Sequence, residues 1–144
     1  MRKIVDAFKT IGIIGLAKNT GKTTTLNYLI NLYKDRVIGL TSIGLDGEEL
    51  DQINFLPKPK IYVRKGMIVA TAEACLEDAN ITYRLIRKVD LFTALGPIRL
   101  IEVTSDGHLV VAGPTTNNEL HQLLELMKPY DDKLFIDGAF NRMT

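Results

Sequence analysis

The sequence predicts a three-layer α/β fold, with a parallel sheet between helices and an antiparallel β-meander inserted at one edge. Runs at 11–16, 37–43 and 133–138 are short and apolar, which is typical of strands buried on both faces of a parallel sheet. An amphipathic stretch of helical period separates the first two runs. Turn-forming residues divide the middle of the chain into strand-length pieces. With 144 residues, the chain has the size of a single domain, 1–144.

The first unit is a strand at 11–16, a helix at 21–33 and a second strand at 37–43. Four apolar side chains recur at helical spacing along one face of the helix: Leu26, Leu29, Ile30 and Tyr33. A strand, a helix and a strand in so short a span favour a βαβ unit, which joins two parallel strands of one sheet.

The middle of the chain predicts the meander. After a loop at 44–60, short strands are expected around a turn at Lys65-Gly66, a short helix at 71–79, and more strands beyond it. The expected strands cover residues 61–63, 67–70, 83–89, 98–104 and 108–112. The last two flank Ser105-Asp106-Gly107, and Asp-Gly is a strong signal for a β-hairpin turn.

The last unit is a helix at 115–128 and a strand at 133–138. Thr116 and Glu119 have the spacing of a capping box, in which the two side chains satisfy free amides of the first turn. The apolar stripe of this helix consists of Leu120, Leu123, Leu124 and Met127. The strand ends in Asp137, close to the end of the sequence, so we expect a minimal or a truncated core that a partner completes.

The strongest functional signal is the segment GLAKNTGKTTT at 15–25, which lies between the first strand and the first helix. This is the context of a phosphate-binding loop, in which backbone amides and a helix N-terminus hold a polyphosphate. Gly21 lets the backbone approach the phosphates, Lys22 reaches the β- and γ-phosphates, and the Thr23 hydroxyl is placed to bind Mg²⁺. The predicted nucleotide-binding residues are Lys18, Asn19, Thr20, Gly21, Lys22, Thr23 and Thr24. The fold expectation is therefore a P-loop nucleoside triphosphate hydrolase-like core that binds ATP and Mg²⁺.

The spacing of this loop departs from the usual pattern. Leu16 stands where the first glycine is ordinarily found, and Gly15 lies one residue earlier. The alternative is a fortuitous Gly-Lys-Thr at the start of a helix. The preceding strand, the amphipathic helix and the three consecutive threonines favour phosphate binding.

Acidic residues are expected to complete the site. Asp137 ends an apolar strand, as the acid of a Walker B segment does, and is predicted to bind Mg²⁺ and to act with Lys22 in catalysis; the alternative is an ordinary acid before Gly138. Asp46, a predicted metal ligand, and Glu48 follow the second strand, where many P-loop proteins place a phosphate-sensing switch. The alternative there is a solvated acidic turn.

Two further groups are weaker candidates for the site, and the two histidines are not candidates. Thr41 and Ser42 end the second strand and are candidates to touch the metal or the γ-phosphate. Arg142 is a candidate phosphate contact. His108 and His121 show no metal-ligand spacing, so both are expected at the surface.

Composition excludes several classes of protein. The single cysteine, Cys75, excludes an intramolecular disulfide and a cysteine-based zinc site, and favours a cytoplasmic location. Eighteen Lys and Arg against 17 Asp and Glu disfavour binding to nucleic acid by bulk charge. No apolar run reaches the length of a membrane helix, so no membrane association is expected. Basic residues flank the meander and either protect sheet edges or face an acidic partner: Lys58, Lys60, Arg64, Lys65, Arg84, Arg87 and Lys88.

Three segments together resemble one family: GLAKNTGKTTTLNYLI, LTSIGLDGEE, and AGPTTNNEL followed by LFIDGAFNR. They look like the nucleotide-binding small subunit of the lysine 5,6-aminomutase reactivases. The resemblance implies a role in restoring an adenosylcobalamin-dependent aminomutase, with a larger ATPase subunit as protein partner. It places Lys22 and Thr23 at the phosphates and Mg²⁺. It assigns no role to the residues that fall in the other shared segments, Asp46, Glu48, Asp137 and Arg142.

The loop is also similar to the GTNGKTTT loop of the Mur ligases, which activate a carboxylate as an acyl phosphate. Those enzymes need further domains for their substrates, so the likeness indicates shared phosphate geometry. The leading hypothesis is Mg²⁺-dependent binding of ATP, with slow hydrolysis that controls a partner protein. ATP is favoured over GTP because the sequence has no Asn/Thr-Lys-x-Asp guanine motif. Two alternatives stay open: an ATP-using ligase or kinase fragment, and a nucleotide-binding regulatory subunit without hydrolysis.

Overall fold

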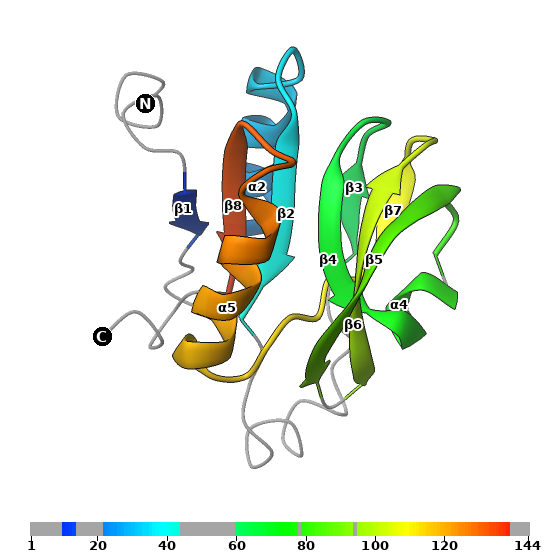
Figure 1. Cartoon of the computed structure of the whole chain (residues 1–144). Coiled ribbons are helices and arrows are strands. Elements are labelled where there is room, and N and C mark those ends of the chain that lie inside the picture. The colour runs from blue at the N-terminus through cyan, green and yellow to red at the C-terminus, as the bar shows by residue number, and fades with distance from the viewer. Residues whose placement is uncertain (1–9, 14–21, 44–59, 78, 94, 139–144) are drawn as a thin grey trace.

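The computed structural model describes residues 10–13, 22–43, 60–77, 79–93 and 95–138, with the backbone alone for 10–13 and 22–25. Its centre is a six-stranded sheet in the order β1-β8-β2-β4-β6-β5 (Figure 1). The strands are β1 (Thr10–Ile13), β8 (Lys133–Asp137), β2 (Ile38–Ser42), β4 (Ile68–Ala72), β6 (Gly96–Val103) and β5 (Tyr83–Thr93). The first four in this order are parallel, whereas β6 and β5 are antiparallel to their neighbours. The predicted α/β class is confirmed.

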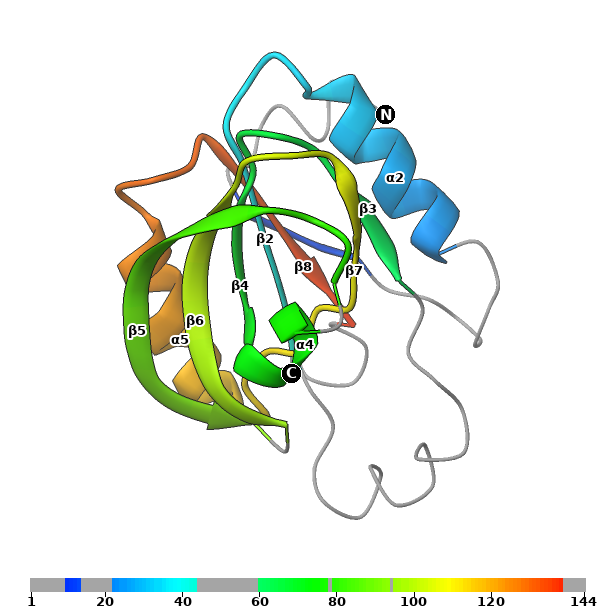
Figure 2. The same cartoon turned by 90° about the vertical axis from the view of Figure 1, so that its right-hand side faces the viewer.

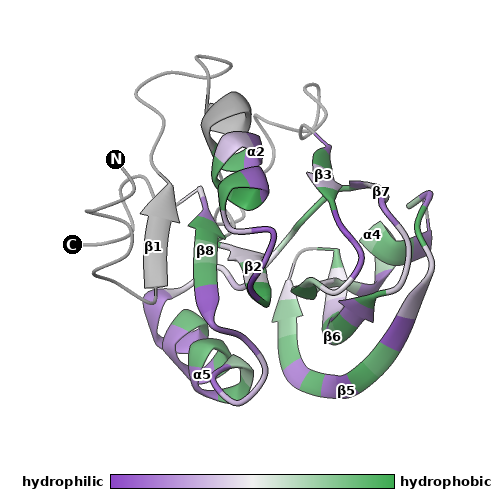
Figure 3. Ribbon diagram, turned by 90° about the horizontal axis from the view of Figure 1, so that it is seen from above, coloured by the Kyte–Doolittle hydropathy of each residue, from purple (hydrophilic) through white to green (hydrophobic). Residues whose placement is uncertain are grey.

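Helices cover both faces of the parallel part of the sheet. Helix α2 (Lys22–Leu32) lies on one face and helix α5 (Asn117–Met127) on the other, as the view from above shows (Figure 3). Because α2 connects the parallel strands β1 and β2, it runs back across the sheet, and its first turn lies at the edge where these strands end. Helix α5 leads into β8, which is parallel to β1 and β2, so the first turn of α5 lies at the same edge of the sheet.

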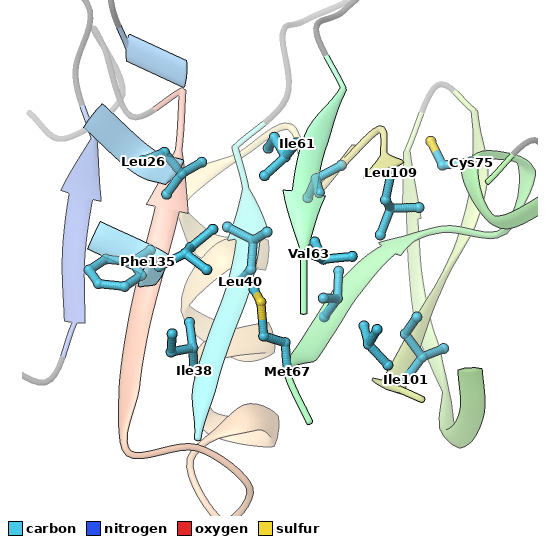
Figure 4. Packing of buried hydrophobic residues seen from close by; sticks show 14 of the residues in the cluster. Leu26, Ile38, Leu40, Ile61, Val63, Met67, Cys75, Ile101, Leu109 and Phe135 are labelled. Carbon is cyan, nitrogen blue, oxygen red and sulfur yellow. The ribbon is translucent and has the colours of Figure 1, made fainter. Parts of the chain in front are cut away.

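The predicted stripe of α2 is buried, and none of its four side chains is more than 2% exposed. It packs on the side chains that β2 and β8 present to this face, Leu40 and Phe135 among them (Figure 4). The rings of Tyr33 and Phe135 lie 6.2 Å apart in a tilted arrangement. This core explains why a helix of modest length is stable here, since most helical stability in proteins comes from packing of the apolar face.

The opposite face forms a second core under α5. Half of the predicted capping box is present: the Thr116 hydroxyl accepts a hydrogen bond from the Glu119 amide at 3.1 Å. The Glu119 carboxylate accepts from the Thr116 hydroxyl at 3.1 Å, where the prediction had it bind a backbone amide. Of the predicted stripe, Leu120, Leu123 and Met127 are buried, and Leu124 is half-buried. Leu123 and Met127 pack with residues of β4, β6 and β8.

The predicted hairpin at Asp106-Gly107 is wrong. Strand β6 pairs with β4 and β5, while β7 (Gly107–Leu109) leaves the main sheet and pairs with β3 (Ile61–Val63) in a separate two-stranded ribbon beside α2 (Figure 2). Gly107 is required for a different reason: a Cβ there would lie 2.6 Å from the side chains of Asn80 and Ile81. The hairpin of this region is β5–β6, which turns into Gly96 at a φ of 107°.

The short helix is also displaced from its predicted span. Helix α4 covers Glu73–Glu77, and the preceding Thr71 and Ala72 are the last residues of β4. The Thr71 hydroxyl donates to the Val110 carbonyl at 3.2 Å and accepts from the Ala112 amide at 2.9 Å. These long-range contacts hold residue 71 in extended backbone, which agrees with the strand preference of β-branched threonine.

Asp106 joins the two loops at the end of the β3–β7 ribbon. Its carboxylate accepts hydrogen bonds from the Lys65 amide at 2.7 Å and the Tyr62 hydroxyl at 3.2 Å. The Lys65 amide, the Tyr62 hydroxyl, and the nearby charges of Arg64 and Lys65 together hold the pKa of Asp106 below its ordinary value of 3.8, against an opposing effect of desolvation.

A lowered pKa stabilises the folded chain above the carboxyl's unfolded pKa of 3.8, and the stabilisation is lost as the pH falls through the lower folded value. We therefore expect Asp106→Asn to be less stable than the parent chain at neutral pH, with the difference shrinking below about pH 4. Urea unfolding across the acid range measures this. Asp35→Asn, at an exposed acid in the turn after α2, is the control and should show a smaller change. A constant difference at all pH values would contradict the prediction.

Candidate functional site

The candidate site lies at the edge of the sheet where the parallel strands end. Strand register pairs Asp137, the last residue of β8, with Ile13 at the end of β1 and with Ser42 at the end of β2. The segment of the predicted phosphate loop that follows Ile13, residues 14–21, lies outside the described residues. The described chain resumes at Lys22, the first residue of α2. The geometry therefore brings together the two ends of the loop and the carboxyl end of β8.

The alternation of β8 decides which face Asp137 belongs to. Phe135 packs in the core under α2, whereas Leu134 and Ile136 pack in the clusters under α5. Side chains two residues apart on a strand share a face, so Asp137 lies on the α2 face, the side on which the helix after the loop packs. Asp137 is 6% exposed, and the turn after it is made by Gly138 at a φ of 76°.

The structure describes only some of the predicted site residues. Three of them, Lys22, Thr23 and Thr24, lie in the first turn of α2, and for these residues the structure describes the backbone alone. The described part of the chain does not include Lys18, Asn19, Thr20, Gly21, Asp46, Glu48 and Arg142. Among the predicted acids, Asp137 is thus the one that the structure places.

The hydroxyls of Thr41 and Ser42 have structural partners. Thr41 Oγ1 donates to the Ala70 carbonyl at 3.0 Å. Ser42 Oγ donates to the Val111 carbonyl at 3.1 Å and accepts from the Gly113 amide at 2.9 Å. Both side chains are fully buried, so their hydroxyls hold the fold together where we expected contacts to metal or phosphate.

These bonds reveal an element that sequence reasoning missed: residues 110–113 cross the ends of β2 and β4. Ser42 holds this segment from β2, and Thr71 holds it from β4 together with a backbone bond from the Ala72 amide to the Ala112 carbonyl at 3.0 Å. We name residues 110–113 the crossing segment. The sequence signal is Gly113 before a proline, a dipeptide that marks a turn or loop. The close approach comes from the structure, where a Cβ on Gly113 would lie 1.8 Å from the Ser42 carbonyl oxygen.

Other candidate ligands are dispersed. His108 is exposed on β7, with its ring 5.3 Å from that of Tyr62, and His121 is exposed on α5. Cys75 is buried in α4, as expected of a small apolar side chain. Within the described ranges, no three His, Cys, Asp or Glu side chains form a group that could hold a metal ion.

No family model, curated protein or solved structure matches this chain. Among the helices that the structure describes, none is long and apolar enough to cross a membrane.

Proposed function

We propose that the chain is a P-loop protein that binds ATP with Mg²⁺ and hydrolyses it slowly. The observation that carries the proposal is the register at the sheet edge, where the end of β1 lies opposite Asp137 and the chain returns at Lys22 to begin α2. The Gly-Lys-Thr sequence occupies the connection between these points. A helix N-terminus after a glycine-containing loop suits a polyphosphate, because free amides and the helix dipole both favour negative charge.

Each group has a defined role in this proposal. Amides from Asn19 to Thr24 and the Lys22 ammonium bind the phosphate oxygens, and Lys22 neutralises the charge that develops as the γ-phosphate leaves. The Thr23 hydroxyl and the Asp137 carboxylate are oxygen ligands of the kind Mg²⁺ prefers. The placement of Asp137 on the α2 face supports its assignment, and Asp46 is proposed as a further ligand.

We propose that the nucleotide state controls a partner protein. By its resemblance to the lysine 5,6-aminomutase reactivases, the chain would act with a larger ATPase subunit on an adenosylcobalamin-dependent aminomutase. Phosphate release that only a protein stimulates would support this role. Release that requires an added small acceptor would support the ligase or kinase alternative, and stable ATP occupancy without turnover would support a regulatory subunit.

The direct test is calorimetric titration of the chain with ATP and with GTP, each with and without Mg²⁺. We expect ATP to bind more tightly than GTP, and Mg²⁺ to strengthen ATP binding. Equal affinities with and without Mg²⁺ would contradict the proposed metal site. Binding of neither nucleotide by the folded chain would contradict the proposed function.

Asp137→Asn tests the acid separately. The amide keeps the size of the side chain but removes its charge, so we expect ATP affinity in Mg²⁺ to fall by about tenfold, or about 1.4 kcal/mol, while affinity in excess chelator stays near that of the parent chain. Asp132→Asn is the matched control, because Asp132 is an exposed acid just before the opposite end of β8. An unchanged response to Mg²⁺ in Asp137→Asn would exclude this residue from the metal site.

A further inference from the structure

Strand β5 forms an open edge of the main sheet. It is the last strand in the sheet order, and among the described strands it pairs with β6 alone (Figures 2 and 3). An edge strand presents unpaired backbone amides and carbonyls, which another extended chain can pair with. The pairing of β5 with β6 is interrupted after Leu85 and after Val89, and the residues between, Arg87 to Val89, pair in continuous register with Leu100 to Ile98.

Large apolar side chains are exposed at both ends of β5. Tyr83 and Leu85 near its start are 42% and 44% exposed, and Phe92 near its end is 60% exposed. Leu95, in the turn that follows, is 47% exposed. The described residues include seven exposed large hydrophobic side chains, and four of them belong to this one strand and its turn. Exposed apolar groups of this kind are a feature of protein–protein interaction sites where they lie close together, and here they form one group at each end of β5.

The middle of β5 is cationic. Arg87 and Lys88 are exposed, and within the described part of the chain neither makes an ion pair. The neighbouring cation Arg84 differs, since it is held by Glu102 across the strand pair at 2.7 Å. The strand carries a single acid, Asp90, so its exposed centre has a net positive charge.

We propose that β5 is the docking site for an extended segment of a partner protein, added to the sheet as a further strand. The segment has apolar residues toward both ends and acidic residues in its middle, which match the apolar ends and the cationic centre of β5. Main-chain hydrogen bonds supply affinity in this mode of binding, and the side chains supply selectivity. The proposal does not rest on nucleotide binding.

Charge argues against the two other occupants of this edge. Lys88 stands at the centre of β5, so antiparallel pairing of two copies about that centre would place the cations of one copy against those of the other, which is unfavourable. Nucleic acid is disfavoured because the chain as a whole carries a net charge of only +1, and β5 offers two unpaired cations.

The probe is a labelled peptide of about ten residues, long enough to span a strand. It has valine and threonine alternating toward both ends and two glutamates in the middle, and its binding is followed by fluorescence anisotropy. We expect it to bind at least about tenfold more tightly than the same peptide with two lysines in the middle. A glutamate peptide with alternate amides N-methylated should lose binding, because it keeps its charge but cannot pair with the strand edge.

Arg87→Glu/Lys88→Glu should reverse this preference between the two peptides. Lys34→Glu/Arg36→Glu is the matched control: it reverses two exposed cations beyond α2 with the same change in net charge, and should bind the glutamate peptide as the parent chain does. Equal binding of the two peptides, or equal loss in both variants, would overturn the proposal. The proposal would also be overturned if the N-methylated peptide bound as tightly as the glutamate peptide, or if a single-stranded oligonucleotide bound more tightly than it. A dimer in sedimentation that became more stable in the Arg87→Glu/Lys88→Glu variant would overturn it as well.

Discussion

Replacing Lys22 with alanine is expected to abolish measurable ATP binding while leaving the fold intact. In the proposed phosphate loop the Lys22 ammonium binds the β- and γ-phosphates, and removing these bonds should weaken binding by about 3 kcal/mol, or at least about a hundredfold in Kd. The residue begins α2, and alanine is the best helix former, so the helix should persist. Calorimetric titration with ATP and Mg²⁺, together with circular dichroism, measures both effects.

The matched control is Lys34→Ala. Lys34 is exposed in the turn beyond the other end of the same helix and makes no part of the proposed site. It should bind ATP as the parent chain does. An unchanged ATP affinity in Lys22→Ala would refute the assignment of the phosphate loop. A loss of ATP affinity in both variants would indicate that ATP binds through the general positive charge of the surface.

Gly113→Ala is expected to have the largest effect on stability. The added Cβ would lie 1.8 Å from the Ser42 carbonyl oxygen and 3.0 Å from Thr41 Oγ1. The first of these is a backbone atom of a buried central strand, which cannot move aside as a flexible side chain does. We expect a loss of about 3 kcal/mol or more in the free energy of unfolding, or a chain that does not fold.

Gly66→Ala distinguishes a steric clash from the conformational effect of replacing glycine. Gly66 has a φ of 96°, and no atom lies within 4 Å of a Cβ built there, so its replacement should cost about 1–2 kcal/mol through backbone strain alone. Urea unfolding of both variants measures the difference. If Gly113→Ala were no more destabilising than Gly66→Ala, the crossing segment would not be packed against β2 as described.

The local elements were predictable where one physical signal dominated. The period of the apolar residues located α2 and its buried stripe, and the capping residues Thr116 and Glu119 located the start of α5. Uniformly apolar runs located β2 and β8, because strands covered by helices on both faces carry no alternation.

Strand pairing was not predictable in the middle of the chain. Asp106-Gly107 has the composition of a hairpin turn, yet the strands on its two sides lie in different sheets. The Asp106 carboxylate accepts from the Lys65 amide, and the backbone of Gly107 packs against Asn80. Both partners are distant in sequence, so a turn signal read from neighbouring residues could not include them.

The sequence by itself determined the α/β class, the two main helices with their buried faces, and the position of the Gly-Lys-Thr segment between the first strand and the first helix. These features depend on residue order and periodicity over one or two turns, which the sequence contains directly. Only the tertiary structure decided that β8 inserts between β1 and β2, that Ser42 and Thr71 hold the crossing segment, and that β5 is an open edge among the described strands. Those features depend on which strands bury each other's surfaces and satisfy each other's backbone groups, and such contacts join residues far apart in the chain.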